Sequence, residues 1–124
     1  MRSKLEETFG KLCTSYGVPF EYEATKLPYT IPESVHKYTP DFILENGIII
    51  ETKGVLSLDD RKKMCLVKAQ YPELDIRFVF GNAKNRIAPR SKTTYGDWCD
   101  QHHFKWCDIR DKAKLLKWFK EGAK

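Results

Sequence analysis

An aspartate, a glutamate and a lysine lie close together in the middle of the chain. Nine residues separate Asp41 from Glu51, and Lys53 comes two positions after Glu51. Side chains alternate along a strand, so Glu51 and Lys53 should point to the same face. Two adjacent carboxylates repel each other unless a divalent cation joins them. This pattern predicts a metal site in which Asp41 and Glu51 bind Mg²⁺.

Such a site could hydrolyse a phosphodiester. Mg²⁺ keeps several waters and binds phosphate oxygens, so it can polarise a phosphate and supply a hydroxide. Lys53 could position or help deprotonate the attacking water and offset the charge that develops on the phosphorane. In the alternative interpretation, Asp41 ends a turn, and Glu51 and Lys53 form an ordinary exposed pair. The isoleucines at 48–50 favour the nuclease interpretation, because they indicate a central strand with an unusual polar end.

The two carboxylates meet only if the hairpin that joins them has the right register. A two-residue turn at positions 46 and 47 would place Asp41 opposite Thr52, on the wrong face. A three-residue loop ending in a left-handed Gly47 would instead pair Asp41 with Glu51. We predict this second register because it also gathers four apolar side chains on the opposite, buried face. They are Phe42, Leu44, Ile48 and Ile50.

The other elements follow from hydrophobic periodicity and from end signals. Helices are predicted at 3–16, 58–70, 94–102 and 112–120, and strands at 18–27, 39–44, 48–53, 75–80 and 104–107. An extended connector is expected between the strands at 18–27 and 39–44, and a polar, basic loop at 81–92. Strands mixed with helices in this order indicate an α/β domain with a mixed β-sheet flanked by helices.

The composition suits a single domain that spans residues 1–124. Its hydrophobic fraction of 41% is ordinary for a globular protein, and no apolar run is long enough to cross a membrane. We therefore expect a soluble, cytoplasmic protein without a membrane partner. A net charge of +5 favours an anionic partner, and nucleic acid is the first candidate.

Basic residues in two segments, and one near the amino terminus, are candidates for DNA phosphate contacts, which give salt-dependent affinity without reading bases. The candidates are Arg61, Lys62 and Lys63 in the second helix, Arg86, Arg90 and Lys92 in the loop, and Arg2 near the amino terminus. The alternative is a solvated helix face and a mobile loop.

Two further features have simpler interpretations than a site. Cys99, His102, His103 and Cys107 are residue types that bind structural zinc, but buried free thiols and surface imidazoles are the preferred account. The basic amphipathic stretch 111–124 could bind a membrane surface or a partner. Packing on the domain is the expectation that we favour for it.

Several short runs are similar to one known family. They are Tyr38-Thr39-Pro40-Asp41-Phe42, Asn46-Gly47-Ile48, Glu51-Thr52-Lys53-Gly54, Asp59-Asp60-Arg61-Lys62-Lys63, Pro72-Glu73-Leu74-Asp75-Ile76-Arg77 and Tyr95-Gly96-Asp97. In these runs the chain resembles the phage T7 endonuclease I family, Holliday junction resolvases of the PD-(D/E)XK nuclease superfamily. The resemblance extends from Arg2 to about Asp108, and the segment after it diverges.

The resemblance implies a restriction-endonuclease-like core and the nicking of branched DNA such as four-way junctions. It implies Mg²⁺ or Mn²⁺ bound by Asp41 and Glu51, with Lys53 in the catalytic set, and it adds Glu6 to that set. Without the family, Glu6 would be assigned to a capping box with Ser3. Nicking of ordinary duplex DNA and silent binding of junctions remain alternatives.

The resemblance also implies a domain-swapped homodimer. In this arrangement 1–27 would be exchanged between subunits, 28–38 would be the bridge, and 39–124 would be the core. Pro28 and Pro32 would stiffen the bridge and restrain it from folding back on itself. A two-fold axis would relate two active sites, which suits paired nicks in a junction.

Overall fold

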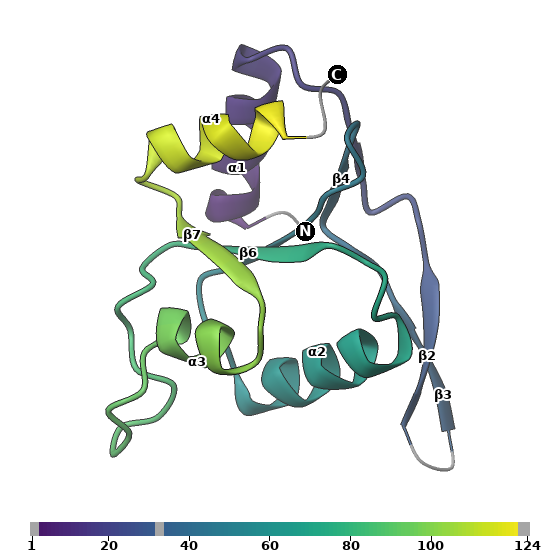
Figure 1. The fold of residues 1–124 in the computed structure, drawn as a ribbon, viewed down its shortest axis with the longest axis vertical. Coiled ribbons are helices and arrows are strands. Elements are labelled where there is room, and N and C mark those ends of the chain that lie inside the picture. Colours follow the sequence, from purple (N-terminus) through teal and green to yellow (C-terminus); the bar gives the residue numbers. More distant parts are fainter. Residues whose placement is uncertain (1–2, 32–33, 122–124) are drawn as a thin grey trace.

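The computed structural model describes residues 3–31 and 34–121, and its elements follow the predicted order (Figure 1). The helices are α1 (Lys4–Ser15), α2 (Leu58–Gln70), α3 (Tyr95–Gln101) and α4 (Lys112–Lys120). The strands are β1 (Phe20–Tyr22), β2 (Leu27–Ile31), β3 (Ser34–Tyr38), β4 (Phe42–Leu44), β5 (Ile49–Lys53), β6 (Ile76–Phe80) and β7 (Lys105–Asp108). Each helix begins and ends within one residue of its predicted bounds. The α/β class is confirmed.

The main sheet is mixed, as predicted. Its five strands have the order β1-β4-β5-β6-β7. The pairs β1–β4 and β4–β5 are antiparallel, whereas β5–β6 and β6–β7 are parallel. Helices cover both faces (Figure 1): α1 and α4 pack on one through Phe9 and Leu115, and α2 and α3 on the other through Met64 and Trp98. The sheet is therefore the middle layer between two hydrophobic cores.

The hairpin between β4 and β5 has the predicted register. Phe42 pairs with Ile50, and extension of the ladder by one residue places Asp41 opposite Glu51. Gly47 ends the three-residue loop with φ at 88°, in the left-handed region that glycine adopts without strain. All four apolar side chains expected on the buried face lie in the core beneath α1 and α4. The turn residues together with the apolar pattern therefore predicted which residues face each other.

The connector at 28–38 corrects one expectation. It is extended, but within a single chain it folds back: β2 and β3 form an antiparallel two-stranded sheet, with Leu27 opposite Tyr38. Pro32 lies outside the described residues. Pro28 does not prevent this pairing, because its backbone has the same orientation in the ladder as that of Thr30. The N–H and C=O of Thr30 face outward and bond the side-chain amide of Gln70. The missing N–H of Pro28 therefore removes no ladder bond.

The carboxyl-terminal helix packs on the domain, as expected. Leu115 and Trp118 of α4 are buried. Asn46 in the hairpin loop donates to the carbonyls of Trp118 and Glu121, and the buried Arg77 forms an ion pair with Glu121. Among the residues that the structure describes, no helix combines the length and apolar character that a membrane span requires.

Gly96 in α3 is required by a close approach to Trp106. A Cβ atom built on Gly96 would lie 2.6, 2.8 and 2.9 Å from three atoms of the indole ring. The ring is held by a hydrogen bond from its Nε1 to Asp100. We expect Gly96→Ala to lower the free energy of unfolding by about 1–3 kcal/mol, measured by chemical denaturation. Gly54→Ala is the control, since nothing lies within 4 Å of its Cβ position; equal stability of the two variants would contradict this explanation.

Candidate active site

Asp41 and Glu51 are fixed by hydrogen bonds that cross from one strand to the other. The backbone N–H of Asp41 donates to Glu51 Oε2 over 3.1 Å. In the opposite direction, the backbone N–H and the hydroxyl of Thr52 both donate to Asp41 Oδ2, over 2.9 and 3.0 Å. The hydroxyl of Tyr38 also donates to Glu51 Oε2, over 2.6 Å. The hairpin therefore holds both carboxylates in set positions at the end of the β4–β5 ladder.

Burial shapes the ionisation of these two carboxyls. Glu51 is only 4% exposed, and burial, followed by the negative charge of Asp41, raises its pKa to about 8. Burial also raises the pKa of Asp41, against the opposing effect of the Thr52 hydrogen bonds. A cation at this position would favour the ionised form of both groups.

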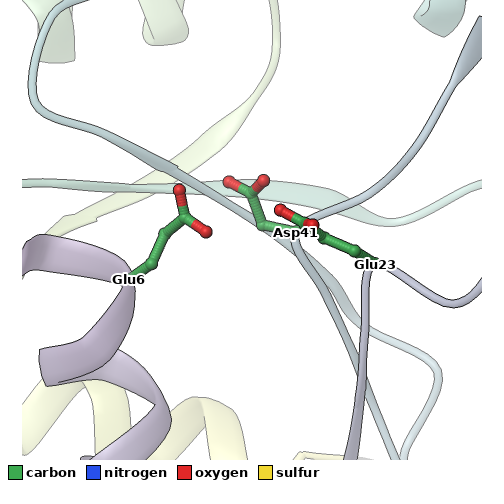
Figure 2. A group of neighbouring side chains, drawn as sticks. All are labelled: Glu6, Glu23 and Asp41. Carbon is green, nitrogen blue, oxygen red and sulfur yellow. The ribbon is translucent and has the colours of Figure 1, made fainter. Parts of the chain in front are cut away.

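Two more carboxylates converge on Asp41, the first member of this pair. One oxygen of Glu6, one of Glu23 and one of Asp41 all lie within 4.8 Å of one another. Figure 2 shows the three side chains as neighbours. They come from α1, from the residue that follows β1, and from the residue that precedes β4. Hard oxygen ligands at this spacing can hold a divalent cation such as Mg²⁺.

The position of Glu6 agrees in part with each of its two interpretations, helix capping and catalysis. Its backbone N–H donates to the Ser3 side chain, which caps α1. Its carboxylate Oε2 instead accepts a hydrogen bond from the Tyr22 hydroxyl and points into the carboxylate cluster. The geometry therefore brings Glu6 next to Asp41, although these residues are far apart in the sequence.

Glu23 was missed by the sequence analysis. It continues the β1–β4 register, in which Tyr22 pairs with Phe42, so it stands opposite Asp41. Its backbone N–H donates to the Asp41 carbonyl over 3.2 Å, and its φ of 50° is unusual for a residue other than glycine. The alternation of Phe20 and Tyr22 indicates the strand, but no local pattern indicates that β4 is its neighbour.

Lys53 completes the site on the same strand as Glu51. Its Nζ donates to Asp60 Oδ1 over 3.2 Å. Burial lowers the pKa of Lys53, but the charges of Glu51, Asp60 and Asp41 outweigh this effect and the net pKa is raised. The side chain is therefore a fixed cation, which suits charge stabilisation better than proton abstraction.

The predicted DNA contacts differ in their surroundings. Arg61 donates to the carbonyls of Leu56 and Ile87 over 2.8 and 3.2 Å, so it ties the basic loop to α2. Lys63 Nζ lies 5.6 Å from the centre of the Tyr38 ring. Four other candidates are exposed, and Arg2 lies outside the described residues. The exposed ones are Lys62, Arg86, Arg90 and Lys92.

The structure does not bring together the four residues considered for zinc. Cys99 belongs to the core beneath α2 and α3, and Cys107 to the core on the opposite face. The Nδ1 atom of His102 lies 3.6 Å from a different thiol, that of Cys65. Cys99 and Cys107 are free and buried, and burial raises the pKa of the Cys107 thiol to about 12.

The raised pKa of Glu51 predicts how stability depends on pH without metal. Between pH 4.5 and about 8 the unfolded chain loses the Glu51 proton before the folded protein does. Because of Glu51, the free energy of unfolding should therefore fall as pH rises through that window, by up to about 1.4 kcal/mol per pH unit. Denaturation in EDTA at pH 6 and pH 8 measures the effect. The difference should be larger for the wild type than for Glu51→Gln; equal differences would contradict the assignment.

Comparisons with known proteins give matches that cover most or all of the chain. The family described as phage endonuclease I matches residues 1–124. Endonuclease I of Escherichia phage T7 is 48% identical over 123 residues, which cover 99% of this chain and 80% of that protein. Endodeoxyribonuclease 1 of Enterobacteria phage T3 is 50% identical over 107 residues, which cover 86% of this chain and 70% of that protein. These matches confirm the resemblance noted in the sequence, and the chain belongs to the phage endonuclease I family.

Proposed function

We propose that this protein is a Mg²⁺-dependent endonuclease that nicks branched DNA, such as four-way junctions, by hydrolysing phosphodiesters. Membership of the family supports a nuclease, and the names of the phage T7 and T3 relatives support DNA as its substrate. The observation that carries the chemistry is the convergence of Glu6, Glu23 and Asp41 beside Glu51 and Lys53. Binding alone has no need for clustered carboxylates close to a phosphate.

The donor set fits Mg²⁺, and Mn²⁺ should substitute for it. All candidate ligands are carboxylate oxygens, and those of Asp41 and Glu51 are held by backbone and hydroxyl donors. When bound, the ion would polarise the phosphate and make a bound water more acidic. The protein orients Asp41 through Thr52, and Lys53 provides a positive charge for the phosphorane.

The β2–β3 sheet is compatible with a swapped homodimer. β2 and β3 of one chain pair from Leu27 with Tyr38 to Ile31 with Ser34. As in any regular antiparallel ladder, two chains related by a two-fold axis could form the same pairs with each other. Exchange of α1 and β1 would then bring Glu6 and Glu23 of one chain to Asp41 of the other. The dimer would thus have two composite sites, suited to paired nicks.

One experiment separates the alternatives. Purified protein is incubated with a four-way junction and with a linear duplex of matched sequence, each in Mg²⁺ and in Ca²⁺. We expect paired nicks in the junction in Mg²⁺, and binding of the junction in Ca²⁺. Comparable cutting of both DNAs would replace the junction assignment with nicking of ordinary duplex DNA. Binding without cleavage in either Mg²⁺ or Mn²⁺ would indicate a silent junction-binding protein.

A further inference from the structure

We propose that Asp60 of α2 is a positioning residue that holds the Lys53 side chain in the active site. This inference rests on the proposed nuclease function. Lys53 Nζ lies 3.2 Å from Asp60 Oδ1, and the two side chains are 23% and 28% exposed, so both are partly buried. Asp60 itself is not expected to touch the DNA or the metal.

The two carboxylate oxygens of Asp60 have separate tasks. Oδ2 accepts from the backbone N–H of Ser57 over 3.2 Å, and the backbone N–H of Asp60 donates to Ser57 Oγ over 3.1 Å. This reciprocal capping box fixes the carboxylate at the start of α2. The remaining oxygen, Oδ1, is left directed at Lys53. The helix cap therefore sets the position of the lysine's partner.

The start of α2 is a firm support for this contact. Leu56, just before the cap, is buried, and its carbonyl accepts a hydrogen bond from Arg61. Met64 and Val67 anchor the helix in the core. Lys53 lies on β5 at the end of the ladder, and its long side chain has several rotatable bonds. Fixing such a chain costs rotamer entropy, which a rigid partner offsets before the substrate arrives.

A purely structural role for Asp60 makes a different prediction. As a cap, it would matter to α2 alone, and an ion pair this near the surface would add little stability. As a positioning residue, it should affect the cleavage step through Lys53 and leave DNA affinity almost unchanged. Mutation of a residue that orients the groups of an active site typically lowers activity by about 10- to 100-fold.

The test compares three single variants on a four-way junction. Asp60→Asn keeps the size of the side chain but loses its charge, so single-turnover cleavage in Mg²⁺ should slow by about 10- to 100-fold, with junction affinity in Ca²⁺ within about twofold of wild type. Asp60→Glu retains both a carboxylate and a favoured capping residue, and should restore most of the rate. Ser57→Ala removes the hydroxyl that caps α2 but keeps the Ser57 backbone N–H that holds Asp60 Oδ2. It should lower the melting temperature and cleave close to the wild-type rate.

A double variant shows whether Asp60 acts through Lys53. Adding Asp60→Asn to Lys53→Ala should slow the residual cleavage by no more than about twofold, because the group to be positioned is gone. An equal loss in both backgrounds, a wild-type rate for Asp60→Asn, or a loss as large for Ser57→Ala would overturn the inference while the nuclease function stands. Absence of cleavage by the wild type in Mg²⁺ and Mn²⁺ would instead overturn the proposed function, and this inference with it.

Discussion

Glu51→Gln and Lys53→Ala should each slow DNA cleavage by at least about 100-fold while retaining junction binding. Gln has the shape of Glu and can still accept from the Tyr38 hydroxyl and the Asp41 N–H, so the hairpin should keep its geometry. It cannot supply a negative charge to a metal ion. Lys53→Ala removes the cation that faces Glu51 and Asp41. Single-turnover cleavage in Mg²⁺, with affinity measured in Ca²⁺, separates the chemical step from binding.

The control for this prediction is Glu45→Gln. Glu45 is an exposed residue in the loop of the same hairpin and lies outside the carboxylate cluster. Its substitution by Gln removes the same charge as Glu51→Gln. It should cleave at the wild-type rate. Near-normal cleavage by Glu51→Gln would show that its charge is not needed, and the assignment of Glu51 as a metal ligand would have to be abandoned.

Mixing two inactive variants, Glu6→Ala and Asp41→Ala, should restore cleavage. Glu6 precedes the β2–β3 connector and Asp41 follows it, so in a swapped dimer they reach one site from different chains. In a mixed dimer, one site then has both carboxylates and the other has neither. Random pairing after co-refolding makes half the dimers mixed, so about a quarter of all sites should be intact. The readout is single nicks in a four-way junction.

The matched control mixes Asp41→Ala with Glu51→Ala. Both residues follow the connector, so every site takes both from one chain and always lacks one of them. This mixture should stay inactive. If mixed dimers of Glu6→Ala and Asp41→Ala form, as shown by distinguishable tags, and cut no DNA, the composite site is wrong. Activity would then depend on a Glu6 and an Asp41 from the same chain.

Features that depend on neighbouring residues could be predicted from the sequence. The bounds of α2 and α3 follow from capping boxes at Ser57 and Thr94, which act within one helical turn. The β4–β5 register follows from Gly47 together with the apolar pattern, because only the three-residue loop gathers Phe42, Leu44, Ile48 and Ile50 on one face. That register places Asp41 opposite Glu51. These signals are strong because each is satisfied within a few residues.

Tertiary structure alone decided which distant segments share the site. Glu23 reaches Asp41 only because β1 pairs with β4, and the partners Tyr38 and Asp60 reach Glu51 and Lys53 from separate elements. The connector likewise forms a sheet with itself, which its prolines did not indicate. Such contacts result from the packing of many segments at once, since any edge strand offers the same unpaired N–H and C=O groups to several partners. The sequence therefore determined the Asp41, Glu51 and Lys53 hairpin, and the folded chain determined the acidic and hydroxyl groups that surround it.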